Sequence, residues 1–346
     1  MNDIKIKNHL IGNDHSPFII AEMSGNHNQS LERAFELVDA AATSGAHALK
    51  LQTYTSDTIT LKGVYTINDK NSLWSGKDLY DLYSEAHTHW EWHKPIFERA
   101  NEKGMVAFSS PFDVTAVDFL EKLNVPCYKI ASFENTDHVL LKKVAQTGKP
   151  VFMSTGVANI SDVEESVNVL HKNGCKEIIL LKCTSTYPSF PENTNLLTIP
   201  FLREKFNCHV GLSDHTMGIG VSMAAVALGA RAIEKHFTLK REDGGVDAAF
   251  SMEPDEMKLL VDECYKAFLA LGKIQTEVQE AEEKSLVFKR SLYVVEDIVE
   301  GELFSEQNIR SIRPSLGLGT KYYENVLGKK AKMNIKKGTP LTKEMF

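Results

Sequence analysis

Short apolar runs that alternate with segments of helical periodicity constrain the fold of this chain more than any other feature. This alternation is typical of parallel strands joined by crossover helices. Eight such units over about 270 residues predict a (β/α)8 TIM barrel in residues 1–272. A doubly wound sheet is the alternative, but the GxGxxG turn expected after its first strand is absent from the sequence. The predicted strands begin at Phe18, Ala48, Met105, Cys127, Val151, Ile178, Val210 and Ala232.

Beyond residue 272 the chain changes in character. Residues 273–284 are polar and rich in Glu and Gln, so we expect a linker there. Residues 285–346 contain short apolar runs such as Ser291–Val295, a predicted helical turn at 305–309, and glycine-bearing turns at Gly301 and Gly338. This pattern predicts a second, small domain.

Charge and cysteine content exclude several classes of protein. The formal net charge of −7 argues against a general binder of nucleic acid or anionic membranes. The five cysteines form no CxxC pair, as expected of reduced thiols in a cytoplasmic protein. No apolar run approaches the ~20 residues that span a bilayer, and residues 1–7 lack the apolar core of a signal peptide. We therefore expect a soluble cytoplasmic protein.

Two histidines follow neighbouring predicted strands late in the barrel. His215 and His236 each come after a short apolar run, with Asp214 or Glu234 alongside. Parallel β/α units place such residues at the carboxyl ends of the strands, where active sites are built. Neutral imidazole is a common ligand of divalent first-row metals. A hydrogen-bonded cap on each strand is the alternative, but the pairing favours a metal or catalytic role.

Polar side chains follow the other predicted strands as well, and on a barrel they would converge on one mouth. Buried lysines and carboxylates are costly unless paired, so packing alone does not explain them. The lysines and hydroxyls suit a phosphate or carboxylate, whereas the histidines and acids suit a divalent cation and a polyhydroxylated substrate. The combination indicates condensation or cleavage with one phosphorylated partner. The set comprises Glu22, Asn26, His27, Lys50, Gln52, Ser110, Lys129, Ser132, Glu134, Ser154, Thr155, Thr184, Ser185, Tyr187, His215, Glu234, His236 and Asp247.

A long insertion, residues 54–89, follows the second predicted strand. It contains Trp74 and a Tyr-rich segment, 78–86, with helical periodicity. An insertion of this length in a compact repeat is typical of a lid or a substrate-recognition loop. An arm that packs against a partner subunit is the alternative.

Ordered motifs along most of the chain resemble the sialic acid synthase family, enzymes that condense phosphoenolpyruvate with an N-acetylated amino sugar. The tail of this chain resembles the antifreeze-like (SAF) domain of these synthases. The resemblance implies a TIM barrel followed by a SAF domain. The motifs are Ile20–Glu22, Asn26–His27, Lys50–Thr53, Ser109–Phe112, Tyr128–Glu134, Ser154–Gly156, Cys183–Pro188, Gly211–His215, Glu234–Phe237, Arg290–Leu292 and Ser311–Pro314.

Within the family the chain is most similar to the pseudaminic acid synthases. The segment Lys50–Thr55 and the insertion motifs Leu73–Trp74, Leu79–Tyr83 and Glu91–His93 carry this likeness. It implies that the sugar is 2,4-diacetamido-2,4,6-trideoxy-altrose. Aromatic side chains would face the methyl and acetamido groups of this sugar; Tyr54, Trp74 and Phe133 are the candidates.

The resemblance also implies a role for each site residue. His215 and His236 would bind a divalent metal, usually Mn²⁺, with Mg²⁺ or Co²⁺ as alternatives. Glu22 would position or deprotonate the attacking water. Phosphoenolpyruvate would contact Lys50, Ser110, Lys129, Ser132, Ser154 and Ser185. The sugar would contact Gln52, Glu134, Tyr187, Glu234 and Asp247.

Arg313, in the tail, matches a family arginine that reaches into the barrel of a second subunit to hold the N-acyl group. The resemblance therefore implies a domain-swapped homodimer. From the residues alone, a surface arginine that stabilises its own turn is the alternative.

Three other functions remain open from the sequence. The first is a synthase of N-acetylneuraminate or legionaminate, which would use N-acetylmannosamine or a diacetamido-trideoxy-mannose. The second is a phosphorylated 2-keto-3-deoxy sugar synthase or an aldolase that forms a Schiff base through Lys129. The third is a non-catalytic carbohydrate-binding protein.

Overall fold

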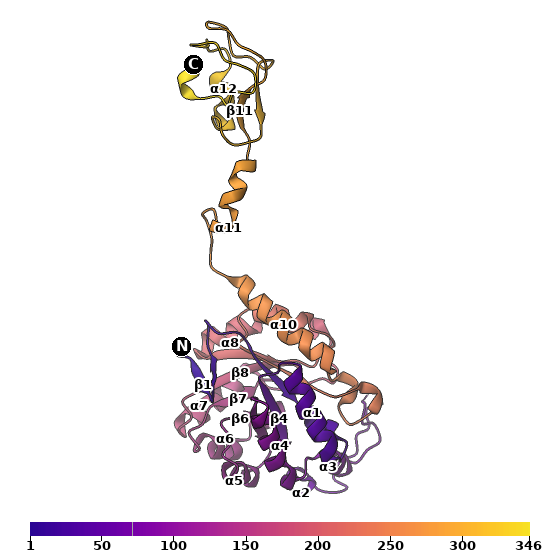
Figure 1. Ribbon diagram of the computed structural model, residues 1–346. Coiled ribbons are helices and arrows are strands. Elements are labelled where there is room, and N and C mark those ends of the chain that lie inside the picture. Colours follow the sequence, from indigo (N-terminus) through magenta and orange to yellow (C-terminus); the bar gives the residue numbers. More distant parts are fainter. Residues whose placement is uncertain (71) are drawn as a thin grey trace. The chain divides into compact units, whose positions relative to one another are not determined.

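The structure, a computed structural model, describes residues 1–70 and 72–346. Two units divide the chain, Met1–Gly272 and Lys273–Phe346. In the first unit, eight parallel strands close into a barrel in the order β10-β3-β4-β5-β6-β7-β8-β9, and helices surround them (Figure 1). The predicted TIM-type barrel is therefore confirmed.

The barrel elements alternate along the chain as predicted. The strands are β3 (Phe18–Glu22), β4 (Ala48–Thr53), β5 (Val106–Pro111), β6 (Tyr128–Ile130), β7 (Val151–Ser154), β8 (Ile178–Cys183), β9 (His209–Ser213) and β10 (Ala232–His236). The helices are α1 (Leu31–Thr43), α4 (Trp90–Glu102), α5 (Val114–Lys122), α6 (His138–Ala145), α7 (Ile160–Lys172), α8 (Thr198–Phe206), α9 (Gly220–Ala227) and α10 (Pro254–Leu271). Short 3-10 turns in the loops are η1 (Ser24–His27), η2 (Ser132–Glu134), η3 (Pro191–Asn193), η4 (Arg241–Asp243) and η5 (Ala248–Phe250).

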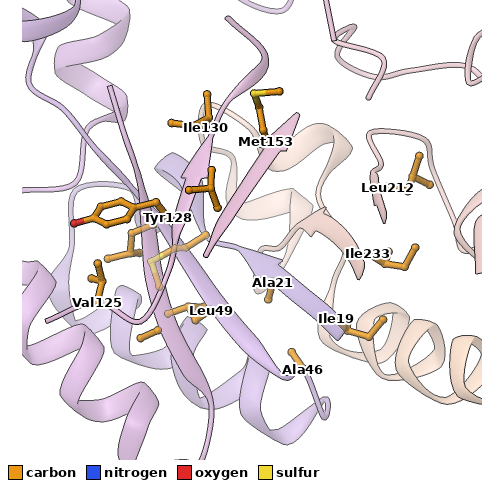
Figure 2. Packing of buried hydrophobic residues seen from close by; sticks show 14 of the residues in the cluster. Ile19, Ala21, Ala46, Leu49, Val125, Tyr128, Ile130, Met153, Leu212 and Ile233 are labelled. Atoms are coloured by element: carbon orange, nitrogen blue, oxygen red, sulfur yellow. The ribbon is translucent and has the colours of Figure 1, made fainter. Parts of the chain in front are cut away.

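Alternate residues of each barrel strand face opposite sides of the sheet. One set, which includes Ile19, Leu49 and Ile233, packs in the layer between sheet and helices (Figure 2). The other set forms a separate apolar cluster inside the barrel, with Phe108 and Phe152 among its largest members. The same inward positions become polar at the carboxyl ends of the strands, which is where the candidate site lies.

A hairpin that the sequence does not predict closes the other end of the barrel. Strands β1 (Ile4–Ile6) and β2 (His9–Ile11) pair antiparallel before the barrel begins. Their buried isoleucines join the interior cluster together with Phe18, the first residue of β3. Strands of three residues are too short for their alternation to be recognised. With the amino end filled by apolar side chains, the carboxyl end remains for a site.

The insertion between β4 and α4 contains α2 (Ser56–Ile59) and α3 (Leu79–Ala86). Asp78 caps α3 by accepting a hydrogen bond from the backbone N–H of Tyr80. The predicted helix of the insertion is thus present.

The second unit is built around a small antiparallel pair, β11 (Ser291–Val294) and β12 (Ile309–Ile312). Its own apolar core includes Leu292, Phe304 and Ile309. The predicted helical turn at 305–309 is confirmed as a single turn, in which the backbone N–H of Ile309 donates to the carbonyl oxygen of Ser305 at 3.1 Å before Ile309 opens β12. Its remaining elements are α11 (Glu280–Glu283), η6 (Lys284–Phe288), η7 (Thr320–Tyr322), α12 (Tyr323–Val326) and η8 (Lys343–Met345). Among the described helices of both units, none has the length and apolar character of a membrane span.

Candidate active site

Four charged side chains meet inside the barrel at the carboxyl ends of its strands. Lys50 Nζ lies 2.5 Å from Glu22 Oε2 and 3.7 Å from Glu234 Oε2. Lys129 Nζ lies 3.4 Å from Glu234 Oε1. All four side chains are buried, and each occupies a position that strand alternation directs inward. Two lysines and two glutamates therefore form one buried network.

The network divides its charges unequally. Burial raises the pKa of Glu22, and Lys50 offsets this effect only in part. Burial also acts to raise the pKa of Glu234, but Lys129 and Lys50 outweigh it and the pKa is lowered. Burial acts to lower the pKa of Lys50, yet its two carboxylates raise it, whereas the pKa of Lys129 is lowered by burial. Glu22 and Lys129 are thus the two members whose pKa values shift toward the uncharged form.

Serine hydroxyls gather beside this network around Gly156. A Cβ at Gly156 would lie 2.2 Å from Ser185 Oγ and 2.6 Å from Ser132 Oγ, so only glycine leaves room for both hydroxyls. Ser154 Oγ is buried and has no hydrogen-bond partner among the residues described. Asn135 holds the loop in place by donating to the carbonyls of Ser154 and Gly156 at 3.1 and 3.0 Å. A buried hydroxyl without a partner indicates a ligand site.

Ser110, on β5, joins the serines to the lysines. Its hydroxyl accepts a hydrogen bond from Lys50 Nζ at 3.2 Å, and the residue is fully buried. Ammonium groups and hydroxyl donors in one recess are the groups that bind phosphate and carboxylate oxygens. The recess can therefore hold a small polyanion.

The two predicted histidines lie side by side, with ring centroids 5.4 Å apart. His215 Nδ1 is 3.1 Å from the carbonyl oxygen of Thr184 and 3.9 Å from Cys183 Sγ. His236 Nδ1 lies 3.7 Å from Asp247 Oδ2 and is buried without a hydrogen bond to any residue that the structure describes. In the described part of the chain, no three His, Cys, Asp or Glu side chains converge as metal ligands. The protein thus offers two imidazoles and leaves other coordination positions open.

Burial and neighbouring groups set the protonation of this region. Burial, followed by His215, lowers the pKa of His236 well below its usual value, so this imidazole is neutral at pH 7. Burial opposes charge on Cys183 and His215, but their mutual contact outweighs it. This contact lowers the pKa of Cys183 to about 6 and raises the pKa of His215. Burial raises the pKa of Asp247 to about 6. Neutral imidazole is the form that binds a metal.

Acids and an amide complete the wall next to the histidines. Gln52 Nε2 donates to Glu22 Oε1 at 2.9 Å. Glu134 has a buried Oε2 without a hydrogen-bond partner among the residues described, and burial raises the pKa of this carboxyl to about 7. The Tyr187 ring lies 4.6 Å from the His215 ring and 6.4 Å from the His236 ring. These groups offer acceptors and an aromatic face to a sugar.

The insertion contributes to the same mouth. Trp74 Nε1 donates to the carbonyl of Val246 at 3.0 Å, and its ring lies 5.9 Å from that of Tyr187. Trp74, Gly25 and Val246 line a cavity of about 440 Å³. These contacts favour the interpretation of the insertion as a recognition loop; the partner-packing arm stays a prediction.

The structure also places some predicted residues elsewhere. Asn26 donates to the carbonyl of Phe237, and His27 contacts Thr88, so both brace loops. Asp214 faces the outer side of the barrel and binds Lys235 rather than the site. Arg313 follows β12 in the second unit and is exposed, without a hydrogen bond or ion pair to any described residue. The other members of the predicted catalytic, anion and sugar sets come from the one barrel mouth.

Four polar residues of the site carry no prediction from the sequence. They are Ser24, Asn135, Cys183 and Ser213, whose hydroxyl donates to Glu234 Oε1 at 3.0 Å. If the alternation of β8 and β9 is followed to the last residue of each strand, it directs Cys183 and Ser213 inward. Ser24 and Asn135 lie in loops, where no periodicity indicates their direction.

Comparisons with known proteins agree on one family. The NeuB family model matches residues 37–276, and the SAF domain model matches residues 289–346. A pseudaminic acid synthase from Campylobacter jejuni is 45% identical over 342 residues, which cover 97% of this chain and 99% of that protein. An N,N'-diacetyllegionaminic acid synthase from the same organism is 39% identical, with 92% and 96% covered. The crystal structure of a sialic acid synthetase from Leptospira borgpetersenii in complex with citrate has a TM-score of 0.73 at 33% identity, with 82% of this chain and 95% of that chain covered.

Proposed function

Because this chain belongs to the NeuB family, we propose that it condenses phosphoenolpyruvate with an N-acylated amino sugar and water, and releases phosphate. The similarity to a pseudaminic acid synthase supports 2,4-diacetamido-2,4,6-trideoxy-altrose as the sugar and pseudaminate as the product. One observation carries the proposal: the buried Lys50 and Lys129 lie in the same barrel mouth as the histidine pair.

Phosphoenolpyruvate would bind in the recess between the lysines and the serines. Its charges would be met by Lys50 and Lys129, and its oxygens by the hydroxyls of Ser110, Ser132, Ser154 and Ser185. The free Ser154 hydroxyl and the space above Gly156 support this placement. Charge-assisted bonds in a buried recess would bind the substrate and hold its C3 carbon toward the sugar.

In the proposed reaction, C3 of phosphoenolpyruvate forms a carbon–carbon bond with the aldehyde carbon of the open-chain sugar. The aldehyde oxygen takes up a proton, and positive charge develops at C2. Water adds to C2 and gives a proton to Glu22, whose raised pKa suits it to accept one. The bond between C2 and the phosphate oxygen then breaks, the C2 hydroxyl gives its proton to the departing phosphate, and a ketone remains at C2. The neighbouring Glu234 carboxylate would stabilise the charge at C2.

We propose that His215 and His236 hold a divalent metal, with Mn²⁺ the first candidate and Mg²⁺ or Co²⁺ as alternatives. The two residues fit such an ion, because His236 Nδ1 is buried with no hydrogen-bond partner in the described chain and the rings are 5.4 Å apart. A bound ion would supply a Lewis acid that polarises the aldehyde.

The sugar would lie between the acids and the insertion. Gln52, Glu134, Tyr187, Glu234 and Asp247 would bind its polar groups. Trp74 would give an apolar wall to the 6-methyl and acetamido groups, as its contact with Tyr187 supports. The other aromatic candidates fit less well, because Tyr54 is buried against Tyr83 and Phe112, and Phe133 is 62% exposed.

We further propose that the active form is a domain-swapped homodimer in which Arg313 of one copy reaches the sugar in the other. The exposed Arg313 side chain, which has no partner among the described residues of its own chain, supports this assignment over a turn-stabilising role. All five cysteines are free, which supports a reducing, cytoplasmic location.

Phosphate release from phosphoenolpyruvate with three sugars tests the proposal. The sugars are the diacetamido-trideoxy-altrose, N-acetylmannosamine and the diacetamido-trideoxy-mannose precursor of legionaminate, each with Mn²⁺ and with EDTA. We expect metal-dependent release with the altrose. Release with another sugar alone would keep the reaction and overturn the substrate. No phosphate release with any of the three sugars, or sugar binding without phosphate release, would overturn the proposed reaction.

A further inference from the structure

Ser24 lies between two of the side chains that would bind the sugar. Its hydroxyl donates to Asp247 Oδ2 and accepts from Gln52 Nε2 at 3.0 Å. Gln52 Nε2 gives its second hydrogen to Glu22 Oε1 at 2.9 Å. Ser24 is buried, so solvent does not compete for these bonds. One hydroxyl thus joins the loop that carries Asp247 to the strand that carries Gln52.

The backbone of Ser24 is in the left-handed region, with φ 47°. Residues with a Cβ rarely adopt this conformation, and it persists where the surroundings impose it. Here Asn26 donates to the carbonyl of Phe237 and to Ser251 Oγ, and a Cβ at Gly25 would lie 3.1 Å from the carbonyl oxygen of Ala86. Glycine would relieve the strain at position 24 but would remove the hydroxyl. Serine at this position therefore keeps a hydroxyl that glycine, the residue without backbone strain here, would lack.

The arrangement leaves two acceptors unused. Gln52 Nε2 has given both hydrogens, and Gln52 Oε1 has no hydrogen bond to any described residue. Asp247 Oδ2 accepts from Ser24, while Oδ1 has no such partner in the described chain. Carbonyl and carboxylate oxygens accept from hydroxyl and amide N–H groups. The pair suits an acylamino sugar that presents both kinds of donor.

We propose that Ser24 is a positioning residue that sets the affinity for the sugar, by fixing Gln52 and Asp247 so that these two oxygens meet an amide N–H and a hydroxyl of the substrate. This inference rests on the proposed function, and it adds a residue that helps the site to select its sugar. Ser24 itself does not touch the reacting atoms. Its loss should therefore raise KM for the sugar and leave the binding of phosphoenolpyruvate unchanged.

Two substitutions separate the hydroxyl from the backbone. Ser24→Gly removes the hydroxyl and relieves the strain, whereas Ser24→Ala removes the hydroxyl and keeps the strain. Asn124→Gly is the matched control, because Asn124 is exposed, has φ 53° and follows α5 outside the mouth. Initial rates are measured while the concentration of each substrate is varied in turn, with the sugar that the wild-type protein turns over. Melting temperatures are measured for the same variants.

We expect KM for the sugar to rise about tenfold in both Ser24 variants, as for a lost hydrogen bond to a charged group, while KM for phosphoenolpyruvate stays within about twofold. Ser24→Gly should melt above Ser24→Ala, because only glycine relieves the backbone strain, and Asn124→Gly should keep wild-type kinetics. Unchanged KM for the sugar, or an equal rise of both KM values, would overturn this inference and leave the proposed function standing. A wild-type protein that is inactive with every sugar would overturn the proposed function and this inference with it.

Discussion

Buried lysines lie on both faces of the barrel wall, and their surroundings differ. On the outer face, Lys235 Nζ contacts Asp214 Oδ2 at 3.1 Å and the carbonyls of Thr216 and Gly218 at 2.6 and 2.9 Å. Asp214 also accepts from the Ser222 hydroxyl and from Thr216. Three acceptors for one ammonium satisfy its three hydrogens.

On the inner face the compensation is incomplete. Lys50 and Lys129 share Glu22 and Glu234, but Glu234 Oε2 has no hydrogen bond within the described chain. The Ser154 hydroxyl nearby has none either. Burial of charge occurs on both faces, so burial alone does not distinguish function from structure. The unpaired atoms of the inner face converge on one recess, where a bound ligand would complete their hydrogen bonding.

The first prediction concerns the outer pair. Lys235→Met should lower the free energy of unfolding by about 3–5 kcal/mol, because it leaves the Asp214 carboxylate buried and unpaired. Urea unfolding measures this change. The double variant Asp214→Leu with Lys235→Met should recover part of the loss. A Lys235→Met protein as stable as the wild type would remove the contrast between the two faces.

The second prediction concerns the inner pair. Lys129→Met should lower kcat/KM by about 10²–10³-fold, as expected for the loss of one charge-stabilising donor, while the melting temperature stays near that of the wild type. Glu234 keeps Lys50 as a partner in this variant, which limits the structural cost. Lys182→Met is the control, because Lys182 lies on the outer face of β8 and donates to Thr184 Oγ1. Loss of activity in both variants would argue against a specific role for the inner face.

The third prediction uses Glu134, an inner acid with an unpaired oxygen. Its pKa is about 7 in the folded protein, against 4.5 for an ordinary glutamate. The folded state holds a proton that the unfolded state has released between these values, so stability falls as pH rises through this window. Glu134→Gln removes this penalty. Its stability relative to wild type should therefore increase from pH 4.5 to pH 8, by up to about 3 kcal/mol. A difference that is constant with pH would contradict the assignment.

The fourth prediction tests the space around the serines. Gly156→Ala should raise KM for phosphoenolpyruvate about tenfold, because its Cβ would displace the hydroxyls of Ser132 and Ser185. Melting temperature should change little, since the displaced groups are side-chain ends. If KM for the sugar rose instead, the serine recess would belong to the other substrate.

The sequence predicts the barrel and most of its mouth for one physical reason. Inward-facing residues recur every second position, so a lysine or acid that ends an apolar run is directed to the same place as its neighbours on other strands. The same rule separates Glu234 from Lys235, but only when the register is known. Asp214 precedes His215 in the sequence but binds Lys235 on the outer face, because adjacent residues face opposite sides.

Features that depend on the loops could not be predicted. The left-handed backbone of Ser24 and the bonds of Asn135 result from tertiary contacts with other loops. The amino-terminal hairpin is too short for its alternation to stand out. The role proposed for Arg313 requires a second copy of the chain, and no local pattern would encode such a contact.

Titration calorimetry of phosphoenolpyruvate in the absence of sugar tests the central claim most directly, namely that the inner lysines bind this substrate. It would be applied to the wild-type protein, Lys129→Met and Lys182→Met. We predict equal Kd values for the wild type and Lys182→Met, and binding at least about tenfold weaker for Lys129→Met. Equal affinity in all three proteins would contradict the claim.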